Sequence, residues 1–379
     1  MDFGFSEEQD LLRGQARDFL DKQCPPAVVR RLMASERGYD DAMYRRMAEL
    51  GWTAIPFPER HGGLGLGMVD LTVVLEEMGR HVTPAPLQSA VGLAGMVLLH
   101  GGSEEQRQRW LPSICDGSAV GTVALAEASG RWDAAGVQLA ARRSGDTYVL
   151  RGEKRYVTDA HVAAWMIVPV RTGESAGDGA GVSLLLVDTA APGVTVRTVK
   201  SMDQTRRLCT VVLDDVAVPA DRLVGPEGHG WPLLRKALDR TLVAISAELC
   251  GTAQRAMELS VDYAKTRQQF GRPIGSYQAV AHRCADMLVQ VESAKSLTYY
   301  AAWAVDNDVP EAPLAAAMAK AYASDAARLV TGAAIQVHGG IGFTWEHDMH
   351  LYFKRAKWGE TTLGDAVFHR ERVAQALEL

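Results

Sequence analysis

The stretch from Tyr263 to Asp286 most constrains the fold, because it joins two long helical segments through a short turn. The turn reads Gly271-Arg272-Pro273-Ile274-Gly275, and glycine and proline at this spacing end one helix and redirect the chain. Apolar residues recur at helical spacing over 231–269, 276–306 and 313–337. Successive long helices pack best when they run antiparallel. The sequence therefore predicts a helical bundle in the last third of the chain.

The middle of the chain predicts strands. Residues 137–150 alternate between apolar and polar side chains around Ser144-Gly145-Asp146, which is a hairpin pattern. Further runs rich in apolar and β-branched residues follow at 182–187, 194–199 and 210–218. This part of the chain is expected to form a β domain.

The first part of the chain, up to about residue 120, is predicted to be helical. The segments 6–9 and 103–106 both read Ser-Glu-Glu-Gln, which is a capping box that opens a helix. Residues 69–79 and 87–99 carry apolar side chains at helical spacing. Because helices and strands are segregated along the chain and do not alternate, the expected fold class is α+β.

Composition argues against several classes of protein. The net charge is −6 and no run of Lys and Arg stands out, so neither nucleic acid nor an anionic membrane is an expected partner. The sequence contains no signal-peptide pattern at its N-terminus and no uncharged stretch long enough to span a bilayer. Its five cysteines are widely spaced without a CxxC pair, which predicts reduced thiols in the cytoplasm and no metal site.

A second motif follows the first by about 60 residues and reads Gln336-Val-His-Gly339-Gly340-Ile-Gly-Phe-Thr-Trp-Glu346. Together the two motifs resemble the paired C-terminal signatures of the acyl-CoA dehydrogenase family of flavoproteins, and the resemblance covers nearly the whole chain. It implies an N-terminal helical domain (1–120), a central β-barrel-like domain (121–228) and a C-terminal four-helix bundle (229–379).

The resemblance also implies a function. Members of this family use FAD to dehydrogenate an acyl thioester between its α and β carbons, and they pass the electrons to an electron-transfer flavoprotein. The substrate is expected to be an acyl-CoA or an acyl-carrier thioester, and the protein a homo- or hetero-oligomer, dimeric or tetrameric. The chain looks like the divergent actinobacterial and small-subunit branch of the family, whose members act on bulky or unusual acyl groups.

The resemblance implies a set of residues that contact the cofactor: Ala126, Tyr156, Thr158, Arg267, Phe270, Gln278, Gln336, Gly339 and Gly340. Tyr156 and Thr158 lie two apart on a predicted strand, so both can meet one ligand. Arg267 and Phe270 lie three apart at a predicted helix end and are expected to share a face. They could supply charge for the flavin pyrophosphate and an apolar contact for its adenine.

The predicted thioester contacts depart from the family pattern. Residues 127–133 read Glu-Ala-Ser-Gly-Arg-Trp-Asp, in place of the family's Thr-Glu-Pro signature with its later Ser-Asp. Trp132 occupies the serine position and adds bulk, while Ala126 replaces the threonine. Trp132 and Asp239 are the expected substrate contacts.

The sequence also departs from the family pattern at the base that removes the α proton. One family position for this base corresponds to Leu363, counted from Lys354-Arg355-Ala356-Lys357, and the other corresponds to Thr241. Neither is an acid. Glu360, Glu248 and Asp365 are nearby carboxylates that could serve instead, Asp365 being expected to cap the last helix. The remaining alternative is that this chain carries no base.

Two alternative functions therefore stay open. The chain could be a non-catalytic subunit that completes a partner's FAD site in a heteromeric acyl-CoA dehydrogenase. It could also be a flavin oxidase or tailoring enzyme with the same fold.

Overall fold

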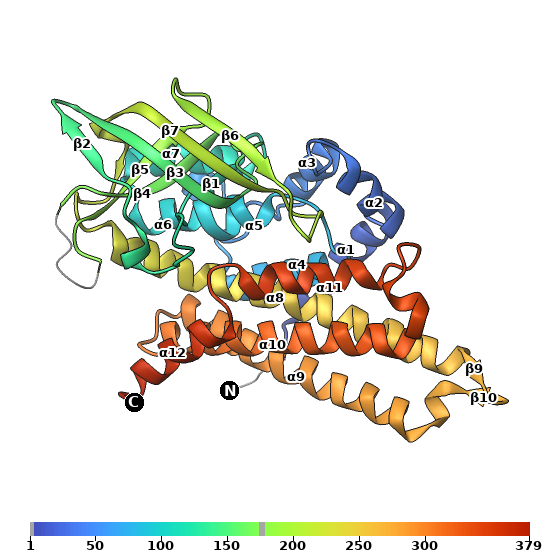
Figure 1. Cartoon of the computed structure of the whole chain (residues 1–379). Helices are drawn as coiled ribbons and strands as arrows, with labels where there is room; N and C mark the ends of the chain where they lie inside the picture. Colours follow the sequence, from blue (N-terminus) through green and yellow to red (C-terminus); the bar gives the residue numbers. More distant parts are fainter. Residues whose placement is uncertain (1–3, 174–178) are drawn as a thin grey trace. The chain divides into compact units, whose positions relative to one another are not determined.

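The computed structural model describes residues 4–173 and 179–379 (Figure 1). They form two compact units, each assembled from separate parts of the chain. The first unit contains Met1–Arg31, Met68–Thr83 and Leu242–Leu379, and the second contains Leu32–Gly67 and Pro84–Thr241.

Helices fill both ends of the chain, as the sequence predicts. They are α1 (Glu7–Gln23), α2 (Pro26–Ala34), α3 (Asp41–Glu49), α4 (Met68–Arg80), α5 (Leu87–Ser89), α6 (Met96–Gly101), α7 (Glu104–Cys115), α8 (Gly230–Thr266), α9 (Gln278–Asp306), α10 (Ala312–His338), α11 (Met349–Thr361) and α12 (Ala366–Ala376). Short helical turns are η1 (Glu59–His61), η2 (Ala90–Gly95), η3 (Ala134–Gly136), η4 (Ala220–Arg222), η5 (Ile274–Ser276) and η6 (Gly339–Phe343). Ser6 and Ser103 form both predicted capping boxes, each accepting a hydrogen bond from the backbone N–H three residues on.

The second unit contains two four-stranded sheets. The strands of the chain are β1 (Gly121–Val123), β2 (Ala141–Ser144), β3 (Thr147–Thr158), β4 (Trp165–Arg171), β5 (Val182–Asp188), β6 (Val194–Val199), β7 (Leu208–Pro219), β8 (Leu223–Val224), β9 (Gln268–Gln269) and β10 (Arg272–Pro273). One sheet has the order β1-β4-β5-β8 and the other β2-β3-β7-β6. Tyr148 and Leu150 from one sheet and Met166 and Leu185 from the other belong to one buried apolar cluster. The predicted hairpin, strands and α+β class are confirmed.

The first unit contains the predicted bundle. In it α10 packs against α9, α11 and α12, and α1 packs against α4 (Figure 1). Two glycines let α4 and α8 cross at close range. A Cβ on Gly79 would lie 2.0 Å from the carbonyl oxygen of Glu248, and a Cβ on Gly251 would lie 1.8 Å from that of Glu76. Backbone meets backbone at this crossing, so no side chain fits there.

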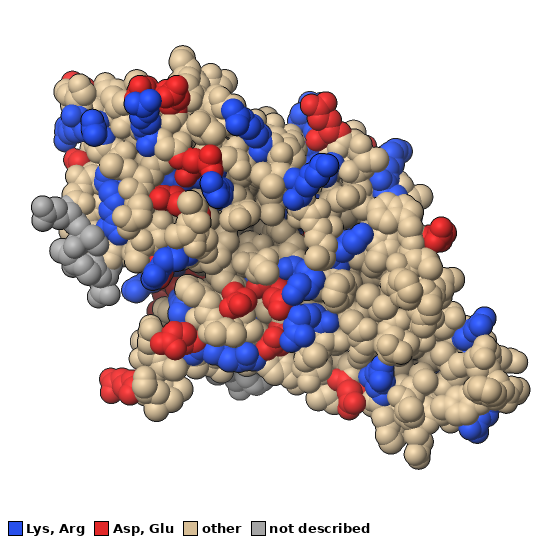
Figure 2. Space-filling view, in the orientation of Figure 1, with Lys and Arg blue, Asp and Glu red and all other residues tan. Residues whose placement is uncertain are grey.

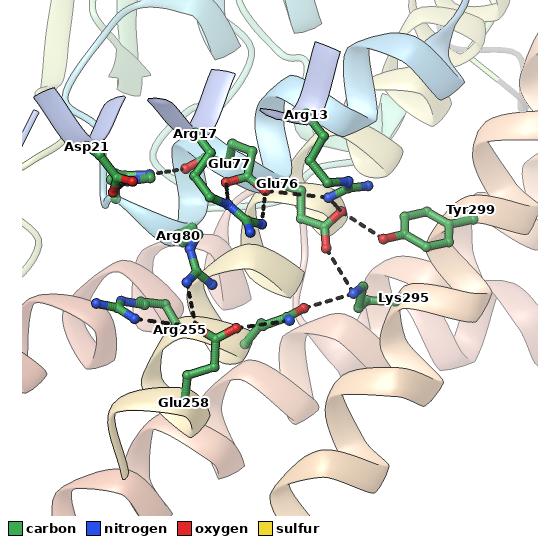
Figure 3. A network of polar contacts seen from close by, with 12 residues as sticks. Arg13, Arg17, Asp21, Glu76, Glu77, Arg80, Arg255, Glu258, Lys295 and Tyr299 are labelled. Carbon is green, nitrogen blue, oxygen red and sulfur yellow. Dashed lines mark hydrogen bonds and ion pairs between the residues drawn. The ribbon is translucent and has the colours of Figure 1, made fainter. Parts of the chain in front are cut away.

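A network of ion pairs fixes α1 in the first unit (Figure 3). Glu76 on α4 accepts hydrogen bonds from Arg13 on α1 at 2.8 Å and from the Tyr299 hydroxyl on α9 at 2.7 Å. Glu77 receives a bidentate contact from Arg17, at 2.7 and 3.0 Å. A cavity of about 320 Å³ lies among these side chains. Because cations neutralise both carboxylates, we interpret the network as structural.

One predicted helix is interrupted. Residues 87–99 were expected to be regular, but α5 passes into the π-helical turn η2 before α6 begins. A π turn closes with i→i+5 hydrogen bonds and inserts locally into an α-helix, so the apolar spacing over the whole segment does not reveal it.

The surface carries mixed charges. On the face drawn in Figure 2, Lys and Arg are interspersed with Asp and Glu. Within the described ranges, none of the helices combines the length and the apolar character needed to cross a membrane.

Candidate active site

Arg267 and Phe270 lie in a tight hairpin and not on a helix. Helix α8 ends at Thr266, and β9 and β10 pair around Phe270 and Gly271. Both turn residues have positive φ, 52° and 79°, as a type I′ hairpin turn requires. The prediction that Arg267 and Phe270 share a helix face was wrong, because the Phe270-Gly271 pair favours a turn over another turn of helix. The Phe270 ring is 92 % exposed, and Arg267 is also exposed.

The other bundle residues predicted to meet the cofactor are exposed as well. Gln278 opens α9, as predicted, and Gln336 lies in the last turn of α10. Gly339 has φ 66° and ψ −145°, a conformation that glycine tolerates and other residues avoid. A Cβ added to Gly339 or Gly340 would meet no atom within 4 Å. The chain's own packing does not need Gly340 to lack a side chain, and an exposed backbone of this kind fits the close approach of a phosphate group.

His338, beside these glycines, is packed. Its ring stacks on Tyr263 with 4.6 Å between ring centroids, and Nδ1 lies 2.8 Å from the carbonyl oxygen of Ala334. Burial lowers the pKa of His338, so it is neutral at physiological pH. The geometry gives it a role in holding the end of α10.

Tyr156 and Thr158 lie at the end of β3, in the second unit. Tyr156 has φ 55° at a bulge in the pairing of β3 with β7, and its side chain is 48 % exposed. Val157 between them is buried, and Thr158 is half-buried. Because the bulge breaks the alternation of the strand, the prediction that Tyr156 and Thr158 share a face does not follow from their spacing. The Thr158 carbonyl accepts a hydrogen bond from the Thr122 hydroxyl at 2.7 Å, which fixes the end of the strand.

Ala126, a predicted cofactor contact, is buried. Its carbonyl oxygen accepts the N–H of Arg155 at 2.8 Å. The loop that follows it is closed by Glu127, whose carboxylate binds the buried ammonium of Lys154 at 2.7 Å. Sequence reasoning did not single out Lys154. The alternation of the strand could have identified it. Tyr148 and Leu150 are buried, and Lys154 lies an even number of residues after them, so its side chain is expected on the same buried face.

The predicted substrate contacts lie on different elements of the second unit. Trp132 is half-buried on the loop between β1 and β2, where Arg131 pairs with Asp133 at 2.5 Å. Asp239 lies on α8 and is 5 % exposed.

The two positions that the sequence resemblance implies for the base hold side chains that cannot accept a proton at neutral pH. Leu363 is buried in the turn between α11 and α12 and has φ 58°. Thr241 is buried on α8, where its hydroxyl lies 2.7 Å from the carbonyl oxygen of Gly92 in η2 and 2.9 Å from that of Ala237. Neither geometry creates a general base.

The candidate carboxylates are all engaged. Glu248 is 1 % exposed and pairs with the guanidinium of Arg355, which is fully buried. Glu360 pairs with Lys357 at 2.5 Å and with Arg328 at 3.3 Å. These three cations bind the two carboxylates.

Asp365 caps α12, as predicted, by accepting the N–H of Phe368 at 2.9 Å. The turn before it is held by two buried side chains. Lys320 donates to the carbonyl oxygens of Gly364 at 2.8 Å and Glu360 at 3.2 Å, and His369 Nε2 lies 3.1 Å from that of Leu363. The backbone around position 363 is therefore rigid. In the part of the chain that the structure describes, no three His, Cys, Asp or Glu side chains are placed to hold a metal ion.

Models of known families match almost the full length of the chain. The acyl-CoA dehydrogenase N-terminal domain matches residues 6–118, the middle domain 122–216 and the C-terminal domain 228–378.

Individual relatives agree with these models. The chain is 34% identical to the probable acyl-CoA dehydrogenase YngJ of Bacillus subtilis (strain 168), over 100% of both chains. It is 30% identical to the solved butyryl-CoA dehydrogenase from Megasphaera elsdenii, with a TM-score of 0.93 and 100% of both chains covered. The solved Tcur3481-Tcur3483 steroid ACAD is 31% identical, with a TM-score of 0.88 over 98% of both chains. The chain belongs to the acyl-CoA dehydrogenase family, FAD-dependent oxidoreductases that dehydrogenate acyl-CoA.

Proposed function

We propose that this chain acts in the α,β-dehydrogenation of a bulky acyl-CoA thioester and depends on a partner chain for the catalytic base. The proposal is carried by one observation: neither position expected for the base holds an acid, and nearby acids are bound by cations. Leu363 and Thr241 occupy these positions, while Glu360 and Glu248 are bound by cations. The similarity to a solved steroid ACAD with a two-protein name supports both the bulky substrate and the partner.

The chemistry explains why the engaged carboxylates matter. A general base must approach the proton that it removes, with an ionised oxygen free to accept it and a pKa close to the working pH. The Glu248 carboxylate is buried and is bound by the guanidinium of Arg355. Glu360 faces two cations in the same way. Each acid is therefore better suited to stabilising the fold than to proton transfer.

The residues available for FAD fit that cofactor. In the proposal Arg267, Gln336 and the Gly339-Gly340 backbone bind the pyrophosphate, and the exposed Phe270 ring contacts the adenine. Tyr156 and Thr158 contact the isoalloxazine. Bound FAD supplies the acceptor for the hydride that leaves the β carbon.

The proposed partners follow from the family. We expect an electron-transfer flavoprotein to take the electrons, and a dimer or tetramer in which a second chain carries the carboxylate. The five cysteines are unpaired in the structure, which supports the expected cytoplasmic location.

Flavin bleaching by acyl-CoAs, measured on the isolated chain and on the co-purified complex, distinguishes the proposed function from its alternatives. The chain would be isolated alone and together with its native partner, and each preparation mixed anaerobically with straight-chain and ring-containing acyl-CoAs while flavin absorbance is followed. We expect bleaching in the co-purified complex with the ring-containing substrate and little or none in the isolated chain. Rapid bleaching of the isolated chain by butyryl-CoA would contradict the proposal. Oxygen consumption without an added acceptor would favour an oxidase.

A non-catalytic subunit is the second candidate, and the paired carboxylates also favour it. Flavin content distinguishes the two functions. The isolated chain should bind FAD if it is the catalytic subunit. It should purify without flavin if it only completes a partner's FAD site.

A further inference from the structure

A single carboxylate closes the loop that carries Trp132. One oxygen of Glu127, Oε1, accepts the N–H groups of Gln138 and Leu139, both at 3.0 Å. The start and the end of the 127–139 loop therefore meet at one atom. Inside the loop, Asp133 accepts the N–H of Gly136 at 3.0 Å and caps the short helix η3.

The same oxygen connects the loop to β3. Lys154 Nζ donates to Glu127 Oε1 at 2.7 Å and to the Leu125 carbonyl at 3.3 Å. The Lys154 side chain is fully buried, and that of Glu127 is 13% exposed. The backbone repeats the connection one residue further along, where Arg155 N–H donates to the Ala126 carbonyl at 2.8 Å.

A buried ammonium is a costly way to join two segments. Desolvation opposes the charged form, and well-packed apolar side chains often stabilise a fold as well as a buried ion pair does. An ion pair adds direction, because it fixes where the partner carboxylate lies. Here it links two segments that the family resemblance implies for the site, the loop after Ala126 and the strand that leads to Tyr156 and Thr158.

We propose that Glu127 and Lys154 are positioning residues, whose ion pair locks the 127–139 loop against the part of β3 that carries Tyr156 and Thr158. The inference rests on the proposed function, in which these segments contact flavin and thioester. Loss of the pair would release the loop and misplace its contacts without removing any of them.

Burial lowers the pKa of Lys154 to about 8, and the charge of Glu127, the group that opposes this shift, favours the ammonium. The lysine is therefore charged at pH 7 and loses its charge as the pH rises past 8. Opening of the loop would expose Lys154 to water, where the ordinary pKa of a lysine is about 10.4. Between these two values the closed loop binds fewer protons than the open loop, so closure should become more favourable as the pH rises, which is a signature that packing alone lacks.

Tryptic cleavage of the apoprotein tests the lock without flavin. The side chain of Arg131 is 57% exposed at the loop, so trypsin can report how often the loop opens. We expect cleavage after Arg131 to be at least about tenfold faster in Lys154→Met and in Glu127→Gln. The matched control is Arg155→Met, which removes a neighbouring exposed cation that pairs with Glu153. Equal cleavage rates in the wild type and both variants would overturn the proposal.

FAD affinity tests the consequence of the lock. Reconstitution of the apoprotein, followed by flavin fluorescence, should give a dissociation constant about tenfold higher in Lys154→Met than in the wild type at pH 7. The wild-type constant should fall between pH 7 and pH 9.5, because closure of the loop is favoured over that range, while that of Lys154→Met should stay flat. If the variants do not fold, the wild-type titration still decides, because a flat wild-type profile contradicts the proposal.

The two readouts separate this inference from the proposed function. Faster cleavage with unchanged FAD affinity would show that the loop is locked but that the lock does not position flavin contacts, and the proposal would fail. A wild type that binds no FAD would overturn both. The proposed function alone would be overturned by a different pair of results. In that case Lys154→Met would weaken FAD binding as expected, but no acyl-CoA would bleach the flavin of any complex.

Discussion

Among the residues that the structure describes, three cationic side chains have no exposed surface: Lys154, Lys320 and Arg355. Each holds a segment in place: the loop at Glu127, the turn at Gly364 and the α8 residue Glu248. A buried charge is tolerated only with partners, so each of these residues makes its surroundings depend on a single side chain.

The Glu248–Arg355 pair gives the first prediction. Glu248→Gln leaves the Arg355 guanidinium buried without its counter-charge, and we expect the free energy of unfolding to fall by about 3–5 kcal/mol in urea titrations. Glu49→Gln is the control, because the Arg46–Glu49 pair is exposed and should contribute less than about 1 kcal/mol. A stable Glu248→Gln variant that has lost flavin reduction would instead identify Glu248 as the base.

Lys320 gives a pH-dependent prediction. Burial lowers the pKa of Lys320 to about 7, against the opposing charges of Asp365 and Glu360, while the unfolded chain has the ordinary value near 10.4. Between these values the unfolded state binds more protons, so stability rises with pH relative to a variant without the amine. The difference in unfolding free energy between wild type and Lys320→Met should shift in favour of the wild type by up to about 1.4 kcal/mol per pH unit above pH 7.

Denaturant titrations of both proteins at pH 7, 8 and 9 would measure this shift. Other titrating groups are common to both proteins and cancel in the difference. A difference that stays constant with pH would place the pKa of Lys320 outside this range.

At the scale of elements, two structures depend on backbone geometry. The α4–α8 crossing requires Gly79 and Gly251, and the β9–β10 hairpin requires positive φ at Phe270 and Gly271. The first positions helices of the bundle, and the second presents an exposed aromatic ring and an arginine at its edge. The helix crossing depends on the absence of a side chain at Gly79 and Gly251, and the hairpin on a backbone turn that leaves Phe270 exposed.

Gly251→Ala should be strongly destabilising. Its new Cβ would overlap the Glu76 carbonyl, and backbone on both helices would have to move, at a cost of about 3 kcal/mol or more. Gly332→Ala on α10 is the matched control, because its Cβ would approach only Phe353, at 3.9 Å. That change should be neutral or stabilising by up to about 1 kcal/mol. Thermal unfolding of both variants checks the pair, and equal melting temperatures would contradict the close crossing.

The hairpin gives a prediction about flavin. Arg267→Ala combined with Phe270→Ala removes a charge and an exposed ring, and we expect FAD affinity to fall more than about tenfold. Flavin content after gel filtration measures the loss. Lys265→Ala, an exposed cation in the last turn of α8, should retain full flavin. Full flavin in the double variant would exclude the hairpin from the cofactor site.

For the whole molecule, activity depends on where the base is. Leu363→Glu would install a carboxylate at the family position, on a turn that Lys320 and His369 already hold. We expect flavin reduction by the isolated chain to rise by a factor on the order of 10² or more, because a positioned general base contributes on the order of 10²–10⁴. Stopped-flow absorbance would measure it.

Leu363→Gln is the control of equal size without the charge, and it should not gain activity. Glu360→Gln should have little effect on flavin reduction in the Leu363→Glu background. If the wild type reduces its flavin rapidly and Glu360→Gln abolishes this reduction, then Glu360 is the base and position 363 is not.

The sequence by itself determined the elements and the family. Capping boxes at Ser6 and Ser103, the alternation around Gly145 and the helical spacing after 231 are local patterns, and hydrogen bonds between near neighbours enforce them. Only the tertiary structure decided which charges are available. Glu248 meets Arg355 107 residues away, and Glu127 meets Lys154 27 residues away. Such pairings depend on how distant elements pack, which local periodicity does not encode.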